Sequence, residues 1–342
     1  MQYILGIESS CDDSAAAIID ENGNILSNIV ISQLEEHAPY LGVVPEIAAR
    51  SHMQNIEYCI LKALSDAELT FDDISAVAAT TGPGLIGGVI VGTMFAKTIC
   101  AAKKIPFISI NHLEGHALTA RLTNQVQYPY LLLLASGGHC QFIAIEGLGK
   151  YHMLGATLDD AAGEVFDKVA KMLNMGYPGG PIVEKTALNG DKDKFKLPLS
   201  MTNRPGCDMS FSGLKTAVLR IVQENKPVTE EFKADICASF QHTIATIFAK
   251  RSSNAIKLFQ EKFDSNDFVL SGGVAANTYI RKYLSETLKK HNFNLICPPI
   301  NLCTDNAVMI AYAGLERFKL ELFDKLDTCP KARWPLSYSE FH

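Results

Sequence analysis

The sequence has little of what a protein that binds nucleic acid through bulk charge needs. It contains 31 lysines and arginines against 37 aspartates and glutamates, so its formal net charge is −6 and its pI is near 5.9. Domains that bind nucleic acid through charge alone are usually basic. A nucleic-acid partner must therefore meet a local basic patch or be held with the help of other proteins.

Paired cysteines are also lacking. The nine cysteines are scattered along the 342 residues, their number is odd, and no CxxC pair occurs. Scattered cysteines in a chain of this length are typical of reduced thiols in the cytosol, most of them small buried hydrophobic side chains. We therefore expect a cytoplasmic protein without a disulfide framework.

A long uninterrupted hydrophobic run is missing as well. The longest weakly polar stretch, Leu85–Ala102, contains Lys97 and three glycines, which favours a buried helix over a membrane span. The chain starts directly with the strand-like Tyr3–Ile7, without a basic and then apolar leader, so no signal peptide is expected. We predict no membrane partner.

The sequence does contain enough apolar material for two domains. Its 342 residues are 47% hydrophobic, and domains typically span roughly 100–200 residues. Strand–turn–strand patterns at 3–19 and 130–146 each begin a half of alternating helices and strands. We predict a duplicated α/β fold with a nucleotide cleft between two lobes, 1–129 and 130–342. The second lobe would carry a helical insert at about 160–265 and a C-terminal arm; one doubly wound domain with an insert is the alternative.

Two glycine-rich turns follow short apolar strands, at Ser136-Gly137-Gly138 and Ser271-Gly272-Gly273. Glycine lets the backbone come close to a ligand, and the exposed N–H groups of such turns form a nest for phosphate oxygens. The carboxyl ends of strands are also where α/β sheets bind ligands. The pair suggests nucleotide or phosphate binding, although tight turns also use glycine for purely structural reasons.

The segment between the first two predicted strands is acidic. Glu8-Ser9-Ser10-Cys11-Asp12-Asp13 brings three carboxylates and two hydroxyls to a strand end. Carboxylates beside phosphates repel them unless a cation is present, so this composition suits metal-assisted phosphate or acyl chemistry. A solvated hairpin with ordinary aspartate turn chemistry is the alternative.

A histidine pair offers a metal site. His112 and His116 lie four residues apart in a predicted helix, so both imidazoles can meet one metal ion. Glu114 points away from their face, unlike the glutamate of the zincin motif. Spacing cannot choose a third ligand among 37 acidic residues, but Asp305 is attractive as an expected helix N-cap. A surface or packing role for the pair is the alternative.

These segments resemble the universal tRNA threonylcarbamoyladenosine-synthesis family, in order and over nearly the whole chain. The matching motifs are Gly6–Asp13, Gly82–Leu85, Asn111–His116, Ser136–His139, Ala162–Lys168, Pro178–Pro181, Ser210–Lys215, Ser271–Asn277 and Cys303–Asn306. Departures are small: Cys140 stands where the family usually has threonine, and Glu184 where aspartate is common. They bear only on fine ligand affinity.

The resemblance implies an actin- and Hsp70-like (ASKHA) fold of two lobes and a metal-dependent acyltransferase. The enzyme would move threonylcarbamoyl from threonylcarbamoyl-AMP to the adenosine 3′ of the anticodon in ANN-decoding tRNAs. His112, His116 and Asp305 carry over as ligands of one Fe²⁺ or Zn²⁺ per chain. With the glycine turns included, the predicted contacts to ATP or the adenylate are Ala135, Ser136, Gly137, Gly138, His139, Asp167, Gly180, Glu184, Gly272, Gly273 and Asn277.

The chemistry of such a transfer suggests roles and partners. An adenine amine is a poor nucleophile, so a metal would activate the electrophile, and Asp12 and Glu8 are the candidate catalytic residues, Asp12 to orient or deprotonate the amine. The target base must be splayed out of the anticodon loop. The acidic chain would need the pathway proteins TsaB and TsaE to help hold tRNA, downstream of a threonylcarbamoyl-AMP synthase.

Three other functions stay open at this point. A metallopeptidase, a label that the family has carried, could use the histidine pair, but no glutamate lies on the histidine face. A non-catalytic ASKHA scaffold would not need a full ligand set. A sugar kinase or Hsp70-like ATPase would need the nucleotide turns but neither His112 nor His116.

Overall fold

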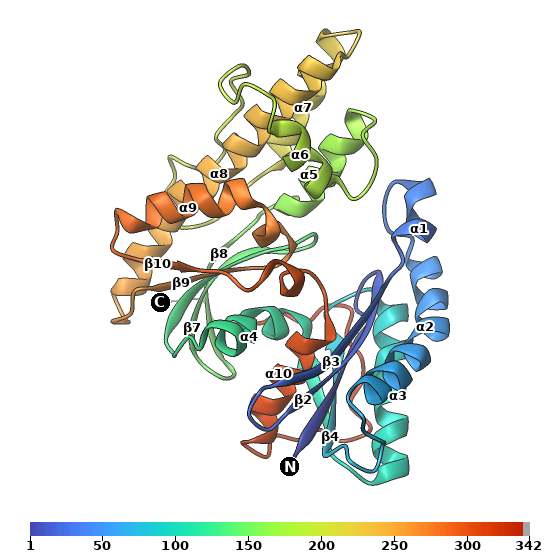
Figure 1. Cartoon of the computed structure of the whole chain (residues 1–342). Coiled ribbons are helices and arrows are strands. Elements are labelled where there is room, and N and C mark those ends of the chain that lie inside the picture. The colour runs from blue at the N-terminus through green and yellow to red at the C-terminus, as the bar shows by residue number, and fades with distance from the viewer. Residues whose placement is uncertain (338–342) are drawn as a thin grey trace. The chain divides into compact units, whose positions relative to one another are not determined.

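The computed structural model describes residues 1–337, which form two compact units (Figure 1). The first unit contains Met1–Gln125 and Asp305–Leu336, and the second is made mainly of Val126–Thr304. Each unit has a five-stranded sheet, in the order β3-β2-β1-β4-β5 and β10-β9-β6-β7-β8. In both sheets an antiparallel three-strand meander is extended by two parallel strands, so the predicted duplication of an α/β fold is confirmed.

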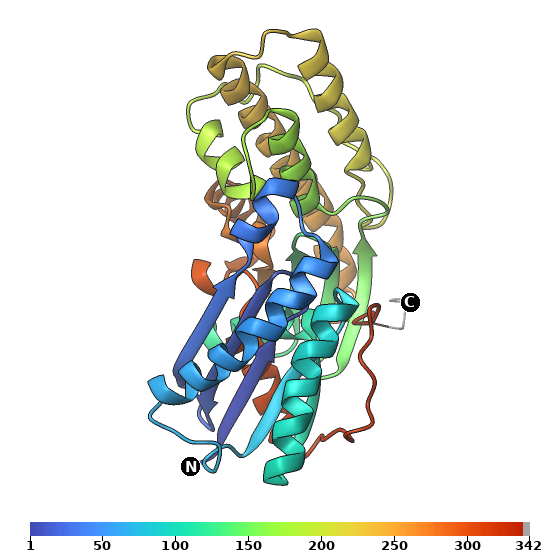
Figure 2. The ribbon, with the colours of Figure 1, turned by 90° about the vertical axis from the view of Figure 1, so that its right-hand side faces the viewer.

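The first unit is a sheet covered by helices on both faces. Its strands are β1 (Tyr3–Glu8), β2 (Asp13–Asp20), β3 (Ile25–Ser32), β4 (Ala76–Gly82) and β5 (Phe107–Asn111). Its helices are α1 (Leu34–His37), the 3₁₀ turn η1 (Ala38–Tyr40), α2 (Pro45–Asp66), α3 (Ile86–Lys103), α4 (His112–Asn124) and α10 (Ala307–Phe318). Figure 2 shows α2 and α3 side by side across one face, whereas α10 packs on β1, β2 and β4 together with α4.

The stretch predicted to form a buried helix forms helix α3, but this helix is only partly buried. Its glycines pack closely on α2 and β1: a Cβ at Gly88 would lie 2.8 Å from the His52 ring of α2, and one at Gly92 would lie 3.4 Å from the Ile7 side chain of β1. On the outer side Ile86, Ile90 and Met94 are exposed. Within residues 1–337 it is the one helix long and apolar enough to cross a membrane by length and composition, which is weak evidence in itself.

Helix α10 returns to the first unit after the chain has built the second. A Cβ at Gly6 would lie 2.6 Å from the Ala311 nitrogen, so only glycine lets α10 come this close to β1. The division expected from the sequence left all of 130–342 in the second lobe. The structure instead changes units near Gln125 and assigns Asp305–Leu336 to the first, because α10 completes the core against β1.

The arm after α10 also packs on the first unit. The Lys331 N–H donates to the Thr81 carbonyl over 2.7 Å, and the Asn111 side chain donates to the Trp334 carbonyl over 3.0 Å. The Lys331 ammonium lies 4.7 Å from the centre of the Trp334 ring. The basic segment Lys331–Trp334 therefore forms an arm that packs on the first unit.

The second unit adds a group of helices to its sheet. The strands are β6 (Tyr130–Ala135), β7 (Cys140–Gly147), β8 (Lys150–Ala156), β9 (Asp267–Ser271) and β10 (Asn294–Ile296). The helices are α5 (Ala162–Met172), α6 (Gly179–Ala187), α7 (Ser212–Glu224), α8 (Glu230–Gln260) and α9 (Thr278–Lys289), with 3₁₀ turns η2 (Gly273–Ala276) and η3 (Ile300–Leu302). Helix α8 packs on β6, β7 and β8, and α6 packs on α8 (Figure 1).

Helix α6 begins within Pro178-Gly179-Gly180-Pro181, a run of prolines and glycines that by itself favours a break over a helix. Pro178 is the N-cap and Pro181 lies in the first turn. Backbone N–H groups of the first turn have no partner inside the helix, so proline is tolerated there. The prolines thus start this helix instead of ending one.

The buried Arg251 of α8 binds the loop that precedes α7. Its side chain is 0% exposed and donates to the carbonyls of Asp208 (2.9 Å) and Arg204 (2.8 Å). We expect Arg251→Met to lower the free energy of unfolding by about 2–4 kcal/mol, because each orphaned carbonyl costs about 1–3 kcal/mol. Urea unfolding would measure it, with Lys250→Met on the exposed side of α8 as control. Equal stability of the two variants would contradict this role.

Candidate metal centre and nucleotide-binding turns

The histidine pair lies at the start of α4, directly after β5. Asn111 caps this helix by accepting a hydrogen bond from the Leu113 N–H over 2.9 Å, which makes His112 its first residue. His116 follows one turn later, and the two ring centres are 4.8 Å apart with planes at 88°. Both side chains are buried, at 7% and 0% exposure. A surface role for the pair is therefore wrong.

Asp305 lies against both imidazoles. Its Oδ1 is 3.1 Å from His116 Nε2 and 3.5 Å from His112 Nε2. The expectation that Asp305 caps the last helix was wrong: Asn306 is the N-cap and accepts from the Met309 N–H over 3.1 Å. Because the neighbouring residue caps α10, the Asp305 carboxylate can face the histidines.

The three donor atoms fit a divalent metal ion. The ligand atoms of His112, His116 and Asp305 lie within 4.8 Å of one another. Ligands at 2.0–2.1 Å in a tetrahedron are roughly 3.3 Å apart, which the two imidazole–carboxylate distances bracket. Two nitrogens and one oxygen suit zinc or ferrous iron and leave coordination positions for a substrate.

Glu114 is turned away from the pair, as its position in the helix predicted. Its carboxylate accepts two hydrogen bonds from Arg317 of α10, over 2.7 and 2.9 Å. The glutamate is nearly fully buried in this ion pair. It therefore cannot act as the general base that the zincin mechanism would need beside the histidines.

Glu8 orients His112 from behind. One carboxylate oxygen lies 3.0 Å from His112 Nδ1, and the other accepts from the Ser10 N–H over 2.6 Å. Burial alone would raise the pKa of Glu8, but the facing His112 holds that pKa below its ordinary value. Burial would lower the pKa of His112, yet Glu8 and Asp305 raise it to about 9. A carboxylate on Nδ1 leaves Nε2 for the metal.

The acidic turn after β1 is built into the fold, so the solvated-hairpin alternative is wrong. Glu8, Ser9 and Ser10 are buried. Burial also raises the pKa of Asp12, with the charge of Asp305 acting in the same direction. Burial and the charges of Asp305 and Asp12 raise the pKa of Asp13 to about 7.

Asp13 did not stand out in the sequence. It is the first residue of β2, next to Asp12, and no spacing rule distinguishes two adjacent aspartates. Only the three-dimensional surroundings give it a pKa near neutrality, which is the property that suits a proton acceptor. Ser10, whose hydroxyl lies 3.0 Å from His112 Nδ1, was likewise not predicted as a site residue.

The two glycine turns of the second unit lie next to each other. Strands β6 and β9 are parallel neighbours with Leu134 beside Ser271, so the turns that follow them leave the same sheet edge. Gly272 has φ +93°, and a Cβ there would meet the Ala135 carbonyl group, 2.8 Å from its carbon. A Cβ at Gly137, Gly138 or Gly273 would meet nothing within 4 Å. The backbone at these three positions is open to a ligand.

The turn after β6 is closed by its own residues. The Ser136 N–H donates to the His139 carbonyl over 2.8 Å, and the His139 N–H donates to the Ser136 hydroxyl over 3.1 Å. The Gly163 N–H at the start of α5 donates to the Ser136 carbonyl over 3.2 Å. The N-terminus of α5 therefore meets this turn, an arrangement that favours anionic groups.

The other predicted nucleotide contacts lie on or beside helices α5, α6 and α9, which hydrogen bonds join to one another. Asp167 of α5 accepts from the Gly179 N–H over 2.7 Å, which brings α6 and Gly180 beside α5. Glu184 of α6 accepts from the Thr278 N–H over 2.7 Å, which joins α6 to α9. Asn277 caps α9, accepting from Ile280 over 2.9 Å and donating to Gln241 over 2.8 Å. All eleven predicted nucleotide residues thus lie in the second unit, in or beside the two glycine turns or on the helices linked to them.

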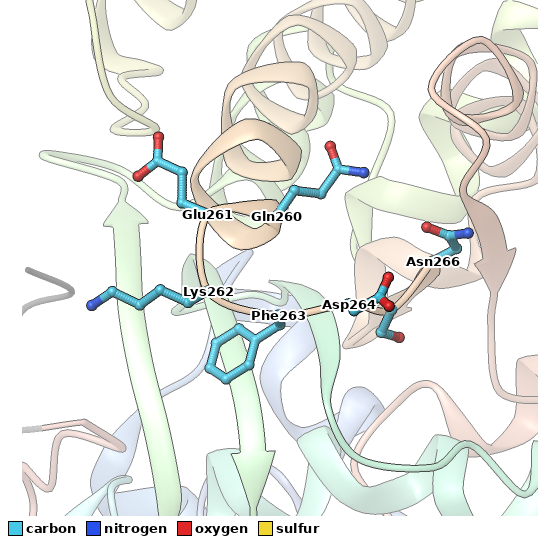
Figure 3. Close-up of a pocket in the computed structure, with 7 residues that line it drawn as sticks. Gln260, Glu261, Lys262, Phe263, Asp264 and Asn266 are labelled. Atoms are coloured by element: carbon cyan, nitrogen blue, oxygen red, sulfur yellow. The ribbon is translucent and has the colours of Figure 1, made fainter.

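A hollow of about 410 Å³ lies at the C-terminal end of α8 (Figure 3). It is lined by Gln260–Asn266, the turn that leads from α8 to β9. Figure 3 shows the ring of Phe263 and the charged side chains of Glu261 and Lys262 spreading from this turn. None of the predicted site residues lines it, so it plays no part in the candidate site.

Two sheets of equal strand order with a two-histidine, one-carboxylate centre define an actin- and Hsp70-like (ASKHA) protein with a candidate metal site. The solved structure of HypF from T. kodakarensis has the same fold, with a TM-score of 0.62 at 16% identity, and the match covers 94% of this chain and 48% of HypF. The chain matches the TsaD family, described as tRNA N6-adenosine threonylcarbamoyltransferase, over residues 24–312. It is 58% identical to the proteins of that name from Rickettsia conorii and Rickettsia bellii, over 98% of this chain and 98% and 99% of those proteins.

The chain belongs to the TsaD family. The family resemblance predicted from the motifs is therefore confirmed, and so is the fold that it implied. The chain matches its relatives over nearly their full length, and it brings together three side chains that could hold a metal ion. Neither the scaffold nor the peptidase interpretation is favoured.

Proposed function

We propose that this chain transfers threonylcarbamoyl from threonylcarbamoyl-AMP to the adenosine 3′ of the anticodon in ANN-decoding tRNAs. The observation that carries the proposal is the His112–His116–Asp305 cluster in a chain that is 58% identical, over 98% of its length, to proteins named for this transfer. The proposal includes one metal ion per chain, Fe²⁺ or Zn²⁺.

The first unit would supply the activation of the electrophile. A metal ion held by His112, His116 and Asp305 would polarise the threonylcarbamoyl-phosphate junction and stabilise the AMP leaving group. Glu8 would keep His112 in the orientation that presents Nε2, which its 3.0 Å contact with Nδ1 supports. In this proposal Glu8 acts through the metal ligand and not on the substrate.

The second unit would hold the AMP part of the adenylate. The open backbone at Gly137, Gly138 and Gly273 and the helix start beside Ser136 suit phosphate oxygens. Asp167 of α5, Glu184 of α6 and Asn277, the N-cap of α9, would fix the remaining groups of the nucleotide. ATP would bind by the same turns.

Proton transfer from the adenine amine needs a carboxylate in the acidic turn. Asp12 remains the candidate that orients or deprotonates the amine. Asp13 joins it, because burial raises the pKa of its carboxylate, which makes it a stronger proton acceptor than an exposed aspartate. The carbamoyl carbon forms its bond to the amine nitrogen, the bond to the phosphate oxygen breaks, and the proton passes from nitrogen to a carboxylate.

The tRNA would be held with the help of TsaB and TsaE in the cytoplasm, downstream of a threonylcarbamoyl-AMP synthase. The net charge of −6 supports this need for partners, because the chain by itself would repel a polyanion. The exposed apolar side chains of α3 support a protein contact, since such patches commonly mark interaction surfaces.

A label-transfer assay tests the function. The chain is mixed with TsaB, TsaE, the synthase, ATP, bicarbonate, labelled threonine and an ANN tRNA, and we expect label in the tRNA. A tRNA with guanosine in place of the target adenosine is the matched control and should stay unlabelled. No label, with the partners shown active beside another family member, would overturn the transferase. Chelator-sensitive digestion of casein would instead revive the peptidase.

A further inference from the structure

Four buried polar side chains of the first unit have no part in the site described above. Ser14 of β2, Gln33 after β3, His37 of α1 and His52 of α2 are each 0% exposed. Burying such groups without partners is costly, so their hydrogen bonds must be satisfied within the protein. They satisfy one another, and they end on a backbone group of the acidic turn.

The chain of hydrogen bonds has a defined direction at its first end. The Val44 N–H can only donate, and it points to His37 Nδ1 over 3.3 Å. His37 must then carry its proton on Nε2, which donates to the Gln33 side-chain oxygen over 3.3 Å. With its oxygen accepting, Gln33 turns its amide nitrogen to the Ser14 hydroxyl, also over 3.3 Å.

The other end imposes the same direction. The Cys11 carbonyl can only accept, and it lies 3.0 Å from His52 Nε2, so that nitrogen carries the proton. His52 Nδ1 is then an acceptor, and the Ser14 hydroxyl donates to it over 2.8 Å. Burial lowers the pKa of His52, which keeps the ring neutral as this pattern requires. From the Val44 N–H to the Cys11 carbonyl, each hydrogen bond is therefore donated in the same direction along the chain of side chains.

The same residues hold the acidic turn at successive points. His52 holds the Cys11 carbonyl at one end of the turn and the Ser14 hydroxyl at the other, and the Gln33 N–H donates to the Asp12 carbonyl over 3.1 Å. Just before them, the Leu85 N–H donates to the Ser10 carbonyl over 2.7 Å. The backbone that carries the Asp12 and Asp13 side chains is thus fixed by residues that do not belong to the turn.

We propose that His52 is a positioning residue of the acidic turn, holding the Asp12 and Asp13 carboxylates in place as a neutral Nε2–H imidazole. Gln33 and His37 extend this support to Val44, beside the exposed residues Tyr40 and Leu41. The inference rests on the proposed function for its effect on transfer, but the tautomer and the rigidity of the turn do not depend on it. A misplacement of reacting groups by about 1 Å can cost roughly 100-fold in rate.

Two substitutions distinguish the roles of the two ring nitrogens of His52. His52→Gln keeps an amide donor near the Nε2 position for the Cys11 carbonyl, whereas His52→Asn keeps a polar group near Nδ1 and loses the Cys11 bond. We expect His52→Asn to lower kcat roughly 10- to 100-fold with little change in KM for threonylcarbamoyl-AMP. Metal content should stay equal to wild type, and His52→Gln should retain most of kcat.

A further measurement uses the wild-type protein alone, so the test survives if the variants fail to fold. Nitrogen NMR of the labelled chain should show His52 protonated on Nε2 and not on Nδ1. Amide hydrogen exchange should show protection of the Gln33 N–H, which donates to the Asp12 carbonyl. His52→Asn should remove this protection while residues of β5 and α4 stay protected. A His52 protonated on Nδ1, or a His52→Asn variant with wild-type kcat and exchange, would overturn the inference. If wild type transfers no label, the proposed function fails, and exchange at the turn still decides the role of His52.

Discussion

Replacing His112 by alanine is expected to abolish stoichiometric metal binding and to lower the rate of transfer by about 100-fold or more. The variant leaves one imidazole and one carboxylate, too few protein ligands for a tight Zn²⁺ or Fe²⁺ site. It also leaves Glu8 buried without the imidazole that lowers its pKa. Metal content by mass spectrometry and label transfer to tRNA, measured on the same preparation, would give both values.

Glu114→Gln is the matched control for His112→Ala. Glu114 lies on the same helix and is as buried as the histidines, but its carboxylate faces Arg317. The glutamine oxygen can still accept one of the two hydrogen bonds from Arg317, and the change leaves the histidines and Asp305 in place. Metal content and transfer should therefore stay within a few-fold of wild type, about 1 kcal/mol. If His112→Ala kept both its metal and its rate, the histidines would have only a packing role. If it lost metal but kept its rate, the metal would be structural.

The fold was predictable where local patterns repeat. The strand–turn–strand units at the start of each half are strongly apolar, and both became the meanders β1-β2-β3 and β6-β7-β8. Proline rules failed at α6, since proline in a first helical turn looks like a break when the helix start is unknown. The return of α10 to the first sheet was not predictable. It depends on a close contact between Gly6 and Ala311, which are about 300 residues apart in the chain.

The candidate site, like the fold, could be predicted from the sequence only in part. The four-residue spacing of His112 and His116 determines a shared helix face, and their geometry follows from α4 alone. Asp305 is distant in the sequence, so only the packing of α10 against α4 shows that it lies beside the histidines as the candidate third ligand. The reason given for it in the sequence was mistaken, since Asn306 is the N-cap. Glu8, expected to be catalytic, lies against His112 and fits an orienting role.

Gly272→Ala is expected to be the most damaging small change in the second unit. Its backbone, with φ +93° and ψ 168°, lies in a region that only glycine populates readily. An alanine Cβ would also press on the Ala135 carbonyl, at the end of the neighbouring strand. Relief requires the ends of β6 and β9 to separate. We expect a loss of about 2–4 kcal/mol in the free energy of unfolding and at least about tenfold weaker binding of AMP.

Gly273→Ala, one residue along, separates strain from ligand contact. Its φ is not positive, and its Cβ would meet nothing within 4 Å, so the variant should unfold within about 0.5 kcal/mol of wild type. If the turn cradles phosphate, the same methyl group occupies the space of the ligand, and AMP binding by calorimetry should weaken at least about tenfold despite normal stability. A stable Gly273→Ala that binds AMP as wild type does would remove this turn from the nucleotide site. The effect of Gly272→Ala on binding would then reflect strain alone, because Gly272 would shape the sheet edge without touching the nucleotide.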